Sequence, residues 1–287
     1  MLDAHRIVPP MPRTVLVTGL GLMGGSLAAA LSRAGWNVLL HHRRHEVAER
    51  AEQSGYGRAV TDPAAAMADA DVAVVCTPVG VIADTVRALA AAPGAAVITD
   101  VGSTKGRLAR ELSAQAAGGR YVGSHPMAGS HRQGLDHADP ELFRGRACVV
   151  TPTAASPTRA VDAVDALWRD VGGRVVRMGP DEHDAAVAEA SHLPHILAAT
   201  AAAGLTPLGV PLASSGFRDT TRVAAGSPEL WSGILRDNRA AVLAGIAQAR
   251  ARLEVLAAAL AGDHAEDVHA WLAQGSEARR RFDDRGH

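Results

Sequence analysis

The sequence predicts an α/β protein in which a doubly wound parallel sheet of the Rossmann type precedes an all-helical domain. Up to Met178, short β-branched runs alternate with alanine-rich helical stretches, which is typical of a parallel sheet covered by helices. After Pro180 the sequence contains no further strand-like run. A length of 287 residues also fits two domains of ordinary size. We therefore expect a loose tail at residues 1–12, a sheet domain at 13–179 and a helical domain at 180–287.

The composition excludes several classes of protein. Hydrophobic residues make up 47% of the chain and charged residues 21%, so a globular fold is expected. The 29 basic and 30 acidic residues give a net charge of −1, which favours neither nucleic acid nor an anionic membrane as a partner. Cys76 and Cys148 lie far apart in apolar runs, as buried free thiols do. The sequence shows no signal-peptide pattern and no membrane-spanning stretch, so we expect a cytoplasmic location.

The first candidate site is a glycine turn near the start of the chain. A β-branched strand at Thr14 to Thr18 runs into the motif GLGLMG, which an alanine-rich helical stretch follows. In the G-x-G-x-x-G fingerprint of dinucleotide-binding proteins, the first glycine allows a tight turn, the second lets the backbone approach the pyrophosphate, and the third lets helix and strand pack closely. The motif alone is common, but here it stands between a strand and a helix. We expect these residues to bind a dinucleotide: Gly19, Gly21, Leu22, Met23 and Gly24.

The end of the next strand, Trp36 to His41, indicates which dinucleotide is preferred. An acidic residue normally binds the ribose 2′-hydroxyl of NAD at this point. The sequence instead continues with His42, Arg43 and Arg44, and a guanidinium pairs well with a 2′-phosphate. We expect NADP to be preferred over NAD. The alternative is that both arginines simply begin a solvated helix.

Further strands are expected at residues 71–76, 96–100, 120–122, 147–151 and 174–178. Thr77 and Pro78 follow the first of these, so they should lie at the carboxyl edge of the sheet, where ligands bind, and contact the cofactor. Ser103 and Thr104 follow the second at the same edge. On residue type alone, these two could simply cap the next helix.

His125, directly before Pro126, is a candidate general base held at the end of a strand. A neutral imidazole can take a hydroxyl proton near neutral pH, although a histidine before a proline is often an ordinary turn residue. His192 and His195 stand three apart in a helical stretch, but without a clear third ligand we expect no metal site.

The helical domain should begin with one long helix from Asp181 to Leu205, followed by two helical stretches between Trp231 and Leu260. These alanine-rich helices carry few polar positions. We therefore expect part of their surface to be buried against a second copy of the chain, in a homodimer. The charged tail after Gly275 is expected to fray.

Five motifs together resemble the prephenate dehydrogenase family, which includes arogenate dehydrogenases. The motifs are GLGLMGGS, DVGSTK, GSHPMAGS, SHLPH and FRDTTRVA, and the resemblance extends over roughly residues 13–260. It implies an oxidoreductase of tyrosine biosynthesis. In that reaction a hydride leaves C4 of a cyclohexadienol for NAD(P), the ring carboxylate departs as carbon dioxide, and the ring becomes aromatic.

The resemblance also assigns roles to residues of these motifs. It implies that His125 is the catalytic base and that Ser103 contacts this histidine and the substrate hydroxyl. His195 would lie in the substrate site, Arg222 would pair with a substrate carboxylate, and Asp219 would lie at the edge of the same site. Arg218 could share the role of Arg222 or simply pair with Asp219.

The loop after the HPMAG motif departs from the family pattern. Ser130 and His131 are expected to edge the substrate pocket, but His131-Arg132-Gln133 replaces the glutamate-containing segment that the family commonly has. A cationic rim suits prephenate, which has two carboxylates and no amine, better than arogenate, which carries an ammonium group. Prephenate is therefore the leading substrate, with arogenate and 4-amino-4-deoxyprephenate as alternatives.

Two other interpretations remain. A non-catalytic dinucleotide-binding sensor could keep this fold, although the intact His125, Ser103 and Arg222 argue against it. A β-hydroxyacid dehydrogenase would require a catalytic lysine on a helix, whereas Lys105 is the only lysine.

The chain ends before a regulatory domain of the ACT type, so any inhibition by tyrosine is expected to act at the active site.

Overall fold

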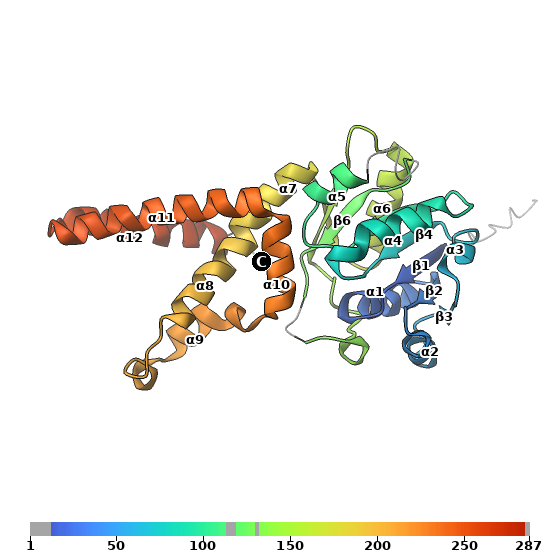
Figure 1. Ribbon diagram of the computed structural model, residues 1–287, viewed down its shortest axis with the longest axis horizontal. Coiled ribbons are helices and arrows are strands. Elements are labelled where there is room, and N and C mark those ends of the chain that lie inside the picture. The colour runs from blue at the N-terminus through green and yellow to red at the C-terminus, as the bar shows by residue number, and fades with distance from the viewer. Residues whose placement is uncertain (1–12, 113–118, 130–131, 285–287) are drawn as a thin grey trace, which may run out of the picture.

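The computed structural model describes residues 13–112, 119–129 and 132–284; the expected tail at 1–12 lies outside the described residues. The first half is built on a five-stranded parallel sheet, in which β1 is central (Figure 1). The strand order is β3-β2-β1-β4-β5. The bounds are β1 (Thr14–Thr18), β2 (Asn37–His41), β3 (Arg58–Ala59), β4 (Val72–Val75) and β5 (Val97–Asp100). This confirms the predicted Rossmann-type parallel sheet.

Helices cover both faces of this sheet because successive side chains of a strand point to opposite faces. Val15 and Val17 of β1 pack into one hydrophobic cluster, and Leu16 packs into the other. The first cluster contains Leu27 of α1, and the second contains Ile82 of α4. The helices of this half are α1 (Leu22–Arg33), α2 (His45–Gln53), α3 (Pro63–Ala66), α4 (Val79–Ala91), α5 (Gly106–Glu111) and α6 (Thr158–Asp170).

A second, three-stranded sheet of order β6-β7-β8 continues from the first. Its strands are β6 (Gly123–Pro126), β7 (Ala147–Thr151) and β8 (Arg174–Arg177), with β6 antiparallel to β7 and β7 parallel to β8. A single parallel bridge between Ile98 and Tyr121 links it to β5.

This second sheet corrects two expectations. The strand predicted at 120–122 begins at Gly123 instead, so that His125 lies within β6, opposite Val149 of β7, and not after the strand. The later strands form their own sheet and do not complete the first. The β-branched content of this segment is low, and pairing with the distant β7 defines the strand, so local sequence could not locate it.

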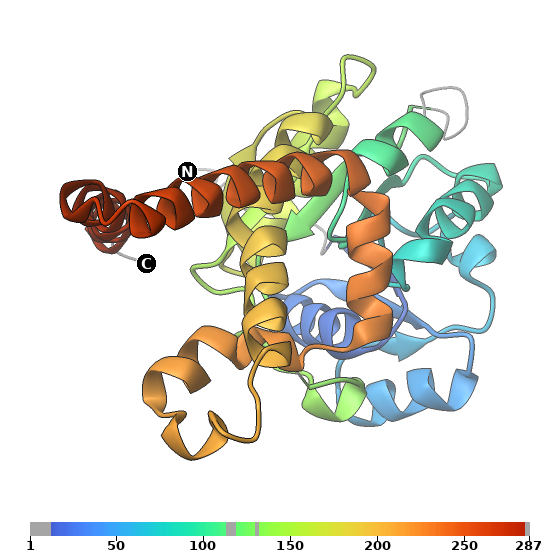
Figure 2. The ribbon, with the colours of Figure 1, turned by 60° about the vertical axis from the view of Figure 1, so that its left-hand side comes forward.

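The second half is entirely helical in the residues described, as predicted. Its helices are α7 (Pro180–Val187), α8 (Leu193–Ala203), α9 (Ser215–Thr221), α10 (Pro228–Asp237), α11 (Arg239–Ala261) and α12 (Ala265–Asp283). Figure 2 shows α11 and α12 extending away from the sheets. No helix in the described part of the chain has the length and apolar character needed to cross a membrane.

Two helical boundaries differ from the expectation. The long helix predicted from Asp181 to Leu205 contains a π-helical segment at Ala188–His192, between α7 and α8. Pro194 follows this segment, and its missing N–H removes a normal helical hydrogen bond. The tail expected to fray is part of α12 as far as Asp283, where ion pairs one turn apart, such as Arg279–Asp283 at 2.7 Å, support the helix.

The two cysteines are free thiols. Cys148 is buried, whereas Cys76 is only partly buried. Burial raises the pKa of the Cys148 thiol to about 12, so this group is a neutral packing residue at physiological pH.

Candidate active site

The glycine turn has the geometry that its motif predicts. Gly19 adopts a φ of 93°, and a Cβ on it would lie 2.7 Å from the carbonyl carbon of Cys76. A Cβ on Gly24 would overlap the carbonyl oxygen of Gly19. A Cβ on Gly21 would meet no atom within 4 Å, so the middle of the turn faces open space. No side chain caps the N-terminus of α1, which begins with Leu22 and Met23, so its first N–H groups are available to an anion.

Thr77 and Pro78 lie beside this turn, after β4. Pro78 is the N-cap residue of α4. The Thr77 hydroxyl is buried and has no hydrogen-bond partner among the described residues. A buried, unpaired hydroxyl is costly unless a ligand pairs with it, so this atom fits a site for a bound dinucleotide.

The segment after β2 places Arg43 and Arg44 at the surface. Both side chains are exposed, and the Nε of Arg44 lies 3.8 Å from a carboxylate oxygen of Glu46 in the first turn of α2. The Thr18 hydroxyl at the end of β1 lies 2.8 Å from Nδ1 of His41. The edge of the candidate cofactor site therefore carries two exposed guanidinium groups. The nearest acidic residue in the sequence, Glu46, is paired with Arg44.

The predicted base, His125, contacts a residue that the sequence analysis did not identify. Its Nδ1 lies 2.9 Å from Nε2 of His183 on α7, and the two rings meet edge to face with centroids 5.1 Å apart. Burial lowers the pKa of His125 well below 6.5, and the neighbouring His183, Lys105 and His192 add to the effect. His125 is therefore neutral at neutral pH, as a general base must be.

Asp184 completes this cluster. One of its carboxylate oxygens lies 2.8 Å from Nδ1 of His183 and accepts the backbone N–H of Lys105 at 2.8 Å; the other accepts the N–H of Gly106 at 2.8 Å. Burial acts to raise the pKa of the Asp184 carboxyl, but the bonds from His183 and the two backbone groups outweigh it and hold the pKa below its ordinary value. Asp184 is thus a buried carboxylate that connects α7 to the DVGSTK turn.

A second buried cluster lies behind the DVGSTK turn. The ammonium group of Lys105, which is 1% exposed, forms an ion pair with Asp100, and the Tyr121 hydroxyl donates to the other oxygen of that carboxylate at 2.7 Å. The Ser124 hydroxyl donates to the Asp100 carbonyl at 2.7 Å. Lys105 is thus a buried, paired residue that lies before α5 and not within a helix.

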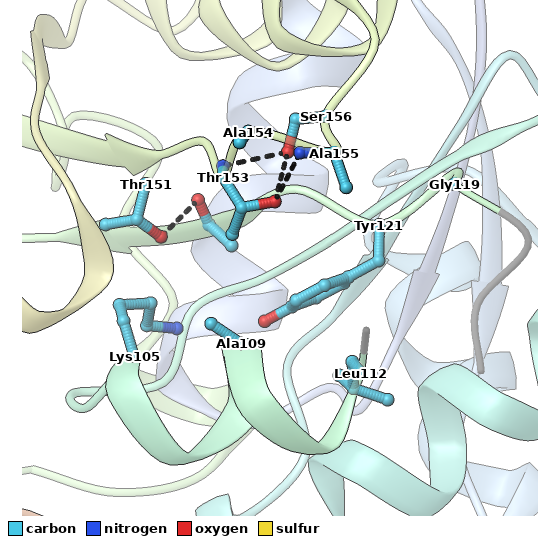
Figure 3. A pocket seen from close by; sticks show the side chains of 11 residues that line it. Lys105, Ala109, Leu112, Gly119, Tyr121, Thr151, Thr153, Ala154, Ala155 and Ser156 are labelled. Carbon is cyan, nitrogen blue, oxygen red and sulfur yellow. Dashed lines mark hydrogen bonds between the residues drawn. The ribbon is translucent and has the colours of Figure 1, made fainter. Parts of the chain in front are cut away.

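A cavity of about 300 Å³ adjoins this cluster (Figure 3). Lys105, Tyr121 and Thr151 lie on its wall, together with the loop at residues 153–156. Neither His125 nor Ser103 lines it. We therefore do not assign this cavity to the substrate.

On the helical domain, His195 stacks on the indole ring of Trp231 of α10, with centroids 3.6 Å apart and planes 15° apart. His195 is 7% exposed, and its Nδ1 has no hydrogen-bond partner in the described structure. The ring of His192 meets the same indole edge to face, and its Nδ1 lies 3.2 Å from the side-chain amide of Asn238. Trp231 was not singled out from the sequence, because nothing in its local pattern shows which ring it stacks on.

The remaining predicted residues are more dispersed. Arg222 is exposed at the start of a 3-10 turn, Arg222–Ala225. Asp219 is exposed and lies 3.7 Å from Arg218, which bears out that pairing. Ser103 is partly buried near the start of α5, and its side chain forms no hydrogen bond with His125 in the described structure; its contact with substrate stays a prediction. Ser130 and His131 lie outside the described residues.

Within residues 13–112, 119–129 and 132–284, no group of three or more histidine, cysteine, aspartate or glutamate side chains could hold a metal ion. His192 and His195 instead contact Trp231, and the Nδ1 of His192 faces Asn238. The two histidines therefore pack against an aromatic ring.

Two solved structures share this architecture over most of the chain. Arogenate dehydrogenase of Synechocystis is 32% identical with a TM-score of 0.84, and the comparison covers 94% of this chain and 99% of that one. Prephenate dehydrogenase from A. aeolicus, solved in complex with hydroxyphenyl propionate and NAD⁺, is 29% identical with a TM-score of 0.86, covering 95% and 99%. With the glycine turn and the unpaired Thr77 hydroxyl, this similarity defines a dehydrogenase that uses a nicotinamide dinucleotide.

The family follows from two domain models. The model described as the nucleotide-binding domain of prephenate dehydrogenase matches residues 27–177, and the model described as its dimerization domain matches residues 179–274. The chain belongs to the prephenate dehydrogenase family.

Curated relatives agree on the family but differ in substrate. Cyclohexadienyl dehydrogenase of Zymomonas mobilis is 31% identical over 92% of this chain and 94% of its own length. Prephenate dehydrogenase of Bacillus subtilis is 34% identical over 81% of this chain and 66% of its own length. The 4-amino-4-deoxyprephenate dehydrogenase of Streptomyces pristinaespiralis is 30% identical over 88% and 86%.

Proposed function

We propose that this protein catalyses the oxidative decarboxylation of prephenate to 4-hydroxyphenylpyruvate, with NADP as its preferred cofactor. The observation that carries the proposal is the neutral His125, oriented by His183 at the junction between the dinucleotide-binding half and the helical half. Membership of the prephenate dehydrogenase family supplies the class of reaction. The cationic sequence that follows the HPMAG motif favours prephenate as the substrate.

In this proposal His125 takes the proton of the C4 hydroxyl. A dinucleotide held at the turn of Gly19, Gly21 and Gly24 would supply the acceptor for the hydride of C4. The bond between C1 and its carboxylate then breaks, its electron pair enters the ring, and carbon dioxide leaves. The C4 oxygen becomes a phenolate, which recovers the proton from His125. The protein thus needs to orient the ring, hold two carboxylates and move one proton.

The other proposed roles rest on the family motifs that carry these residues. Arg222 binds a substrate carboxylate, because a guanidinium fork pairs with carboxylate in a bidentate manner and this one is accessible. His195 lies in the substrate site, where the unpaired Nδ1 can hydrogen-bond a substrate oxygen. Ser103 assists at the C4 hydroxyl, while Asp219, Ser130 and His131 edge the pocket.

The preference for NADP rests on the exposed Arg43 and Arg44 and on the lack of an acidic residue between His41 and His45. NAD is the alternative, since a related structure holds NAD⁺. The test is to follow NADPH and NADH formation separately at saturating substrate.

We also propose that residues 13–179 and 180–287 are two domains and that the second forms a homodimer. The last strand, β8, ends at Arg177, and the helices start at Pro180. The match to a dimerization domain over residues 179–274 supports the homodimer. So do exposed apolar side chains on its helices, among them Leu243, Leu253, Val255 and Leu260 of α11 and Leu272 of α12.

Two other substrates have specific support. The similarity to an arogenate dehydrogenase favours arogenate, and the similarity to a 4-amino-4-deoxyprephenate dehydrogenase favours the 4-amino compound. The test is to compare kcat/KM for all three dienes with NADP and with NAD. We expect prephenate with NADP to give the highest value. A higher value with another diene would replace prephenate, and no turnover with any of them would support a non-catalytic dinucleotide sensor.

A further inference from the structure

His125, His183 and Asp184 form a continuous line of buried polar contacts. Nδ1 of His125 lies 2.9 Å from Nε2 of His183, and Nδ1 of His183 lies 2.8 Å from Asp184. His183 is 0% exposed and Asp184 is 7% exposed. The line crosses the junction between the two halves of the protein, because His125 is on β6 and the other two residues are on α7.

The hydrogen-bond partners determine which atoms carry protons. An ionised carboxylate only accepts, so Nδ1 of His183 must donate to Asp184. The contact between the two rings holds one proton, and we assign it to Nδ1 of His125, which then donates to Nε2 of His183. This leaves Nε2 of His125 unprotonated.

We propose that Asp184 and His183 are positioning residues that together fix His125 in the tautomer whose Nε2 atom is the base. This inference rests on the proposed role of His125 in the reaction. Asp184 sets the tautomer of His183, and His183 sets that of His125. When Nε2 of His125 takes a proton, the same two residues stabilise the resulting imidazolium, because a buried carboxylate lies at the end of the line.

The surroundings hold this arrangement rigid. The carboxylate of Asp184 accepts two backbone N–H groups at the start of α5, from Lys105 and Gly106. The side-chain amide of Asn238, at the end of α10, donates to the backbone carbonyl of Asp184 at 2.7 Å. Two elements distant in sequence thus restrain Asp184: the start of α5 through the carboxylate and the end of α10 through the backbone carbonyl.

The first test reads the tautomers directly and does not depend on activity. In the full-length protein labelled with ¹⁵N-histidine, NMR distinguishes a protonated from an unprotonated ring nitrogen. His125→Asn and His183→Gln variants assign the two sets of signals. We expect both histidines to be protonated at Nδ1 and unprotonated at Nε2 at neutral pH. A His125 protonated at Nε2 would overturn the proposal, whatever the substrate is.

The second test uses variants of His183 and the substrate with the highest kcat/KM. His183→Met removes the acceptor for His125, whereas His183→Gln retains an amide oxygen that can accept from Nδ1. We expect His183→Met to lower kcat about 100-fold with substrate KM within about threefold, and His183→Gln to recover most of the loss. A kcat for His183→Met within threefold of the wild type would overturn the proposal.

A matched structural control separates positioning from stability. Val187→Ala removes buried apolar volume from the same helix, α7, without touching the polar line. It should lower the melting temperature but leave kcat and the pH profile of kcat/KM unchanged.

The charged and titratable groups that face His125 are His183 on α7, His192 on the π-helical segment and Lys105 before α5. Only the His183 variants should shift the acid limb of that profile.

These outcomes distinguish the inference from the proposed function. If the wild type turns over a diene but His125→Asn does as well, the role of His125 as base is wrong. If His125→Asn is inactive and His183→Met is fully active, the base assignment stands and the positioning line is wrong. If His183→Met does not fold, the wild-type NMR spectrum still decides.

Discussion

The α carbon of Gly24 packs so closely against the carbonyl oxygen of Gly19 that a Cβ at position 24 would overlap that oxygen. A Cβ at Gly21 would instead meet open space. The two glycines of one motif therefore have different functions, one in packing and one in leaving room for the pyrophosphate.

This difference gives the first prediction. Gly24→Ala should destabilise the protein by several kcal/mol, because backbone atoms must move to relieve the overlap. Gly21→Ala should keep the wild-type melting temperature but weaken dinucleotide binding at least about tenfold, as it fills the space for the ligand. Thermal unfolding and fluorescence titration with NADPH measure the two effects. Equal melting temperatures for the two variants would contradict this division of roles.

The second prediction concerns the base. His125→Asn should lower kcat by about 10² to 10⁴, because general-base assistance contributes about that factor, with little effect on substrate KM. Steady-state kinetics with saturating cofactor provide the measurement. His269→Asn, on the exposed surface of α12, is the control and should be indistinguishable from the wild type. A near-wild-type kcat for His125→Asn would remove His125 from the chemistry.

The third prediction separates two neighbouring arginines. Arg222→Ala should raise substrate KM about 10- to 100-fold, since hydrogen bonds between charged groups contribute about 1.5–3 kcal/mol. Arg218→Ala should have a smaller effect, because Arg218 is already near the carboxylate of Asp219 at the surface. The substrate KM values of the two variants, measured together with kcat, show which arginine binds the substrate carboxylate. A larger effect at Arg218 would transfer the carboxylate site to that residue.

The fourth prediction tests the cofactor preference. A double variant, Arg43→Ala with Arg44→Ala, should raise KM for NADP about tenfold or more and leave KM for NAD within a factor of about two. Arg159→Ala, which removes an exposed arginine from α6, is the control. If both cofactors are affected equally, the arginines do not recognise the 2′-phosphate.

The fifth prediction is a loss of stability in acid. Burial lowers the pKa of His192 to about 4, from about 6.5 in an unfolded chain. The folded state thus binds fewer protons than the unfolded state between these values. Stability is fully present above pH 6.5 and falls as the pH decreases towards 4, by at most about 3 kcal/mol from this residue.

His192→Asn provides the check, because the asparagine oxygen can replace Nδ1 as acceptor from Asn238 while the titrating ring is removed. Urea unfolding at several pH values should show a flatter pH dependence for this variant than for the wild type. The lowered pKa values of His125 and His195 act in the same direction, so part of the dependence should remain. An unchanged slope would show that His192 does not contribute.

Local sequence was sufficient for the features that depend on neighbouring residues. The GLGLMG turn between a strand and a helix, the alternation of strands and helices, and the change to helices after Gly179 all depend on short-range patterns. The family motifs added the expected roles of His125 and Arg222, which remain predictions for experiment.

The tertiary structure alone decided which groups meet. His183 and Asp184 lie 58 and 59 positions after His125, in a stretch with no recognisable motif of their own, yet they orient the candidate base. The separate second sheet and the stacking of Trp231 on His195 also bring together residues that are far apart in the sequence. Local periodicity reports which face of an element is buried, but the partner across a domain junction depends on how helices and sheets pack. For this reason the sequence by itself determined the fold class and the cofactor turn, and packing between the two halves decided the surroundings of the base.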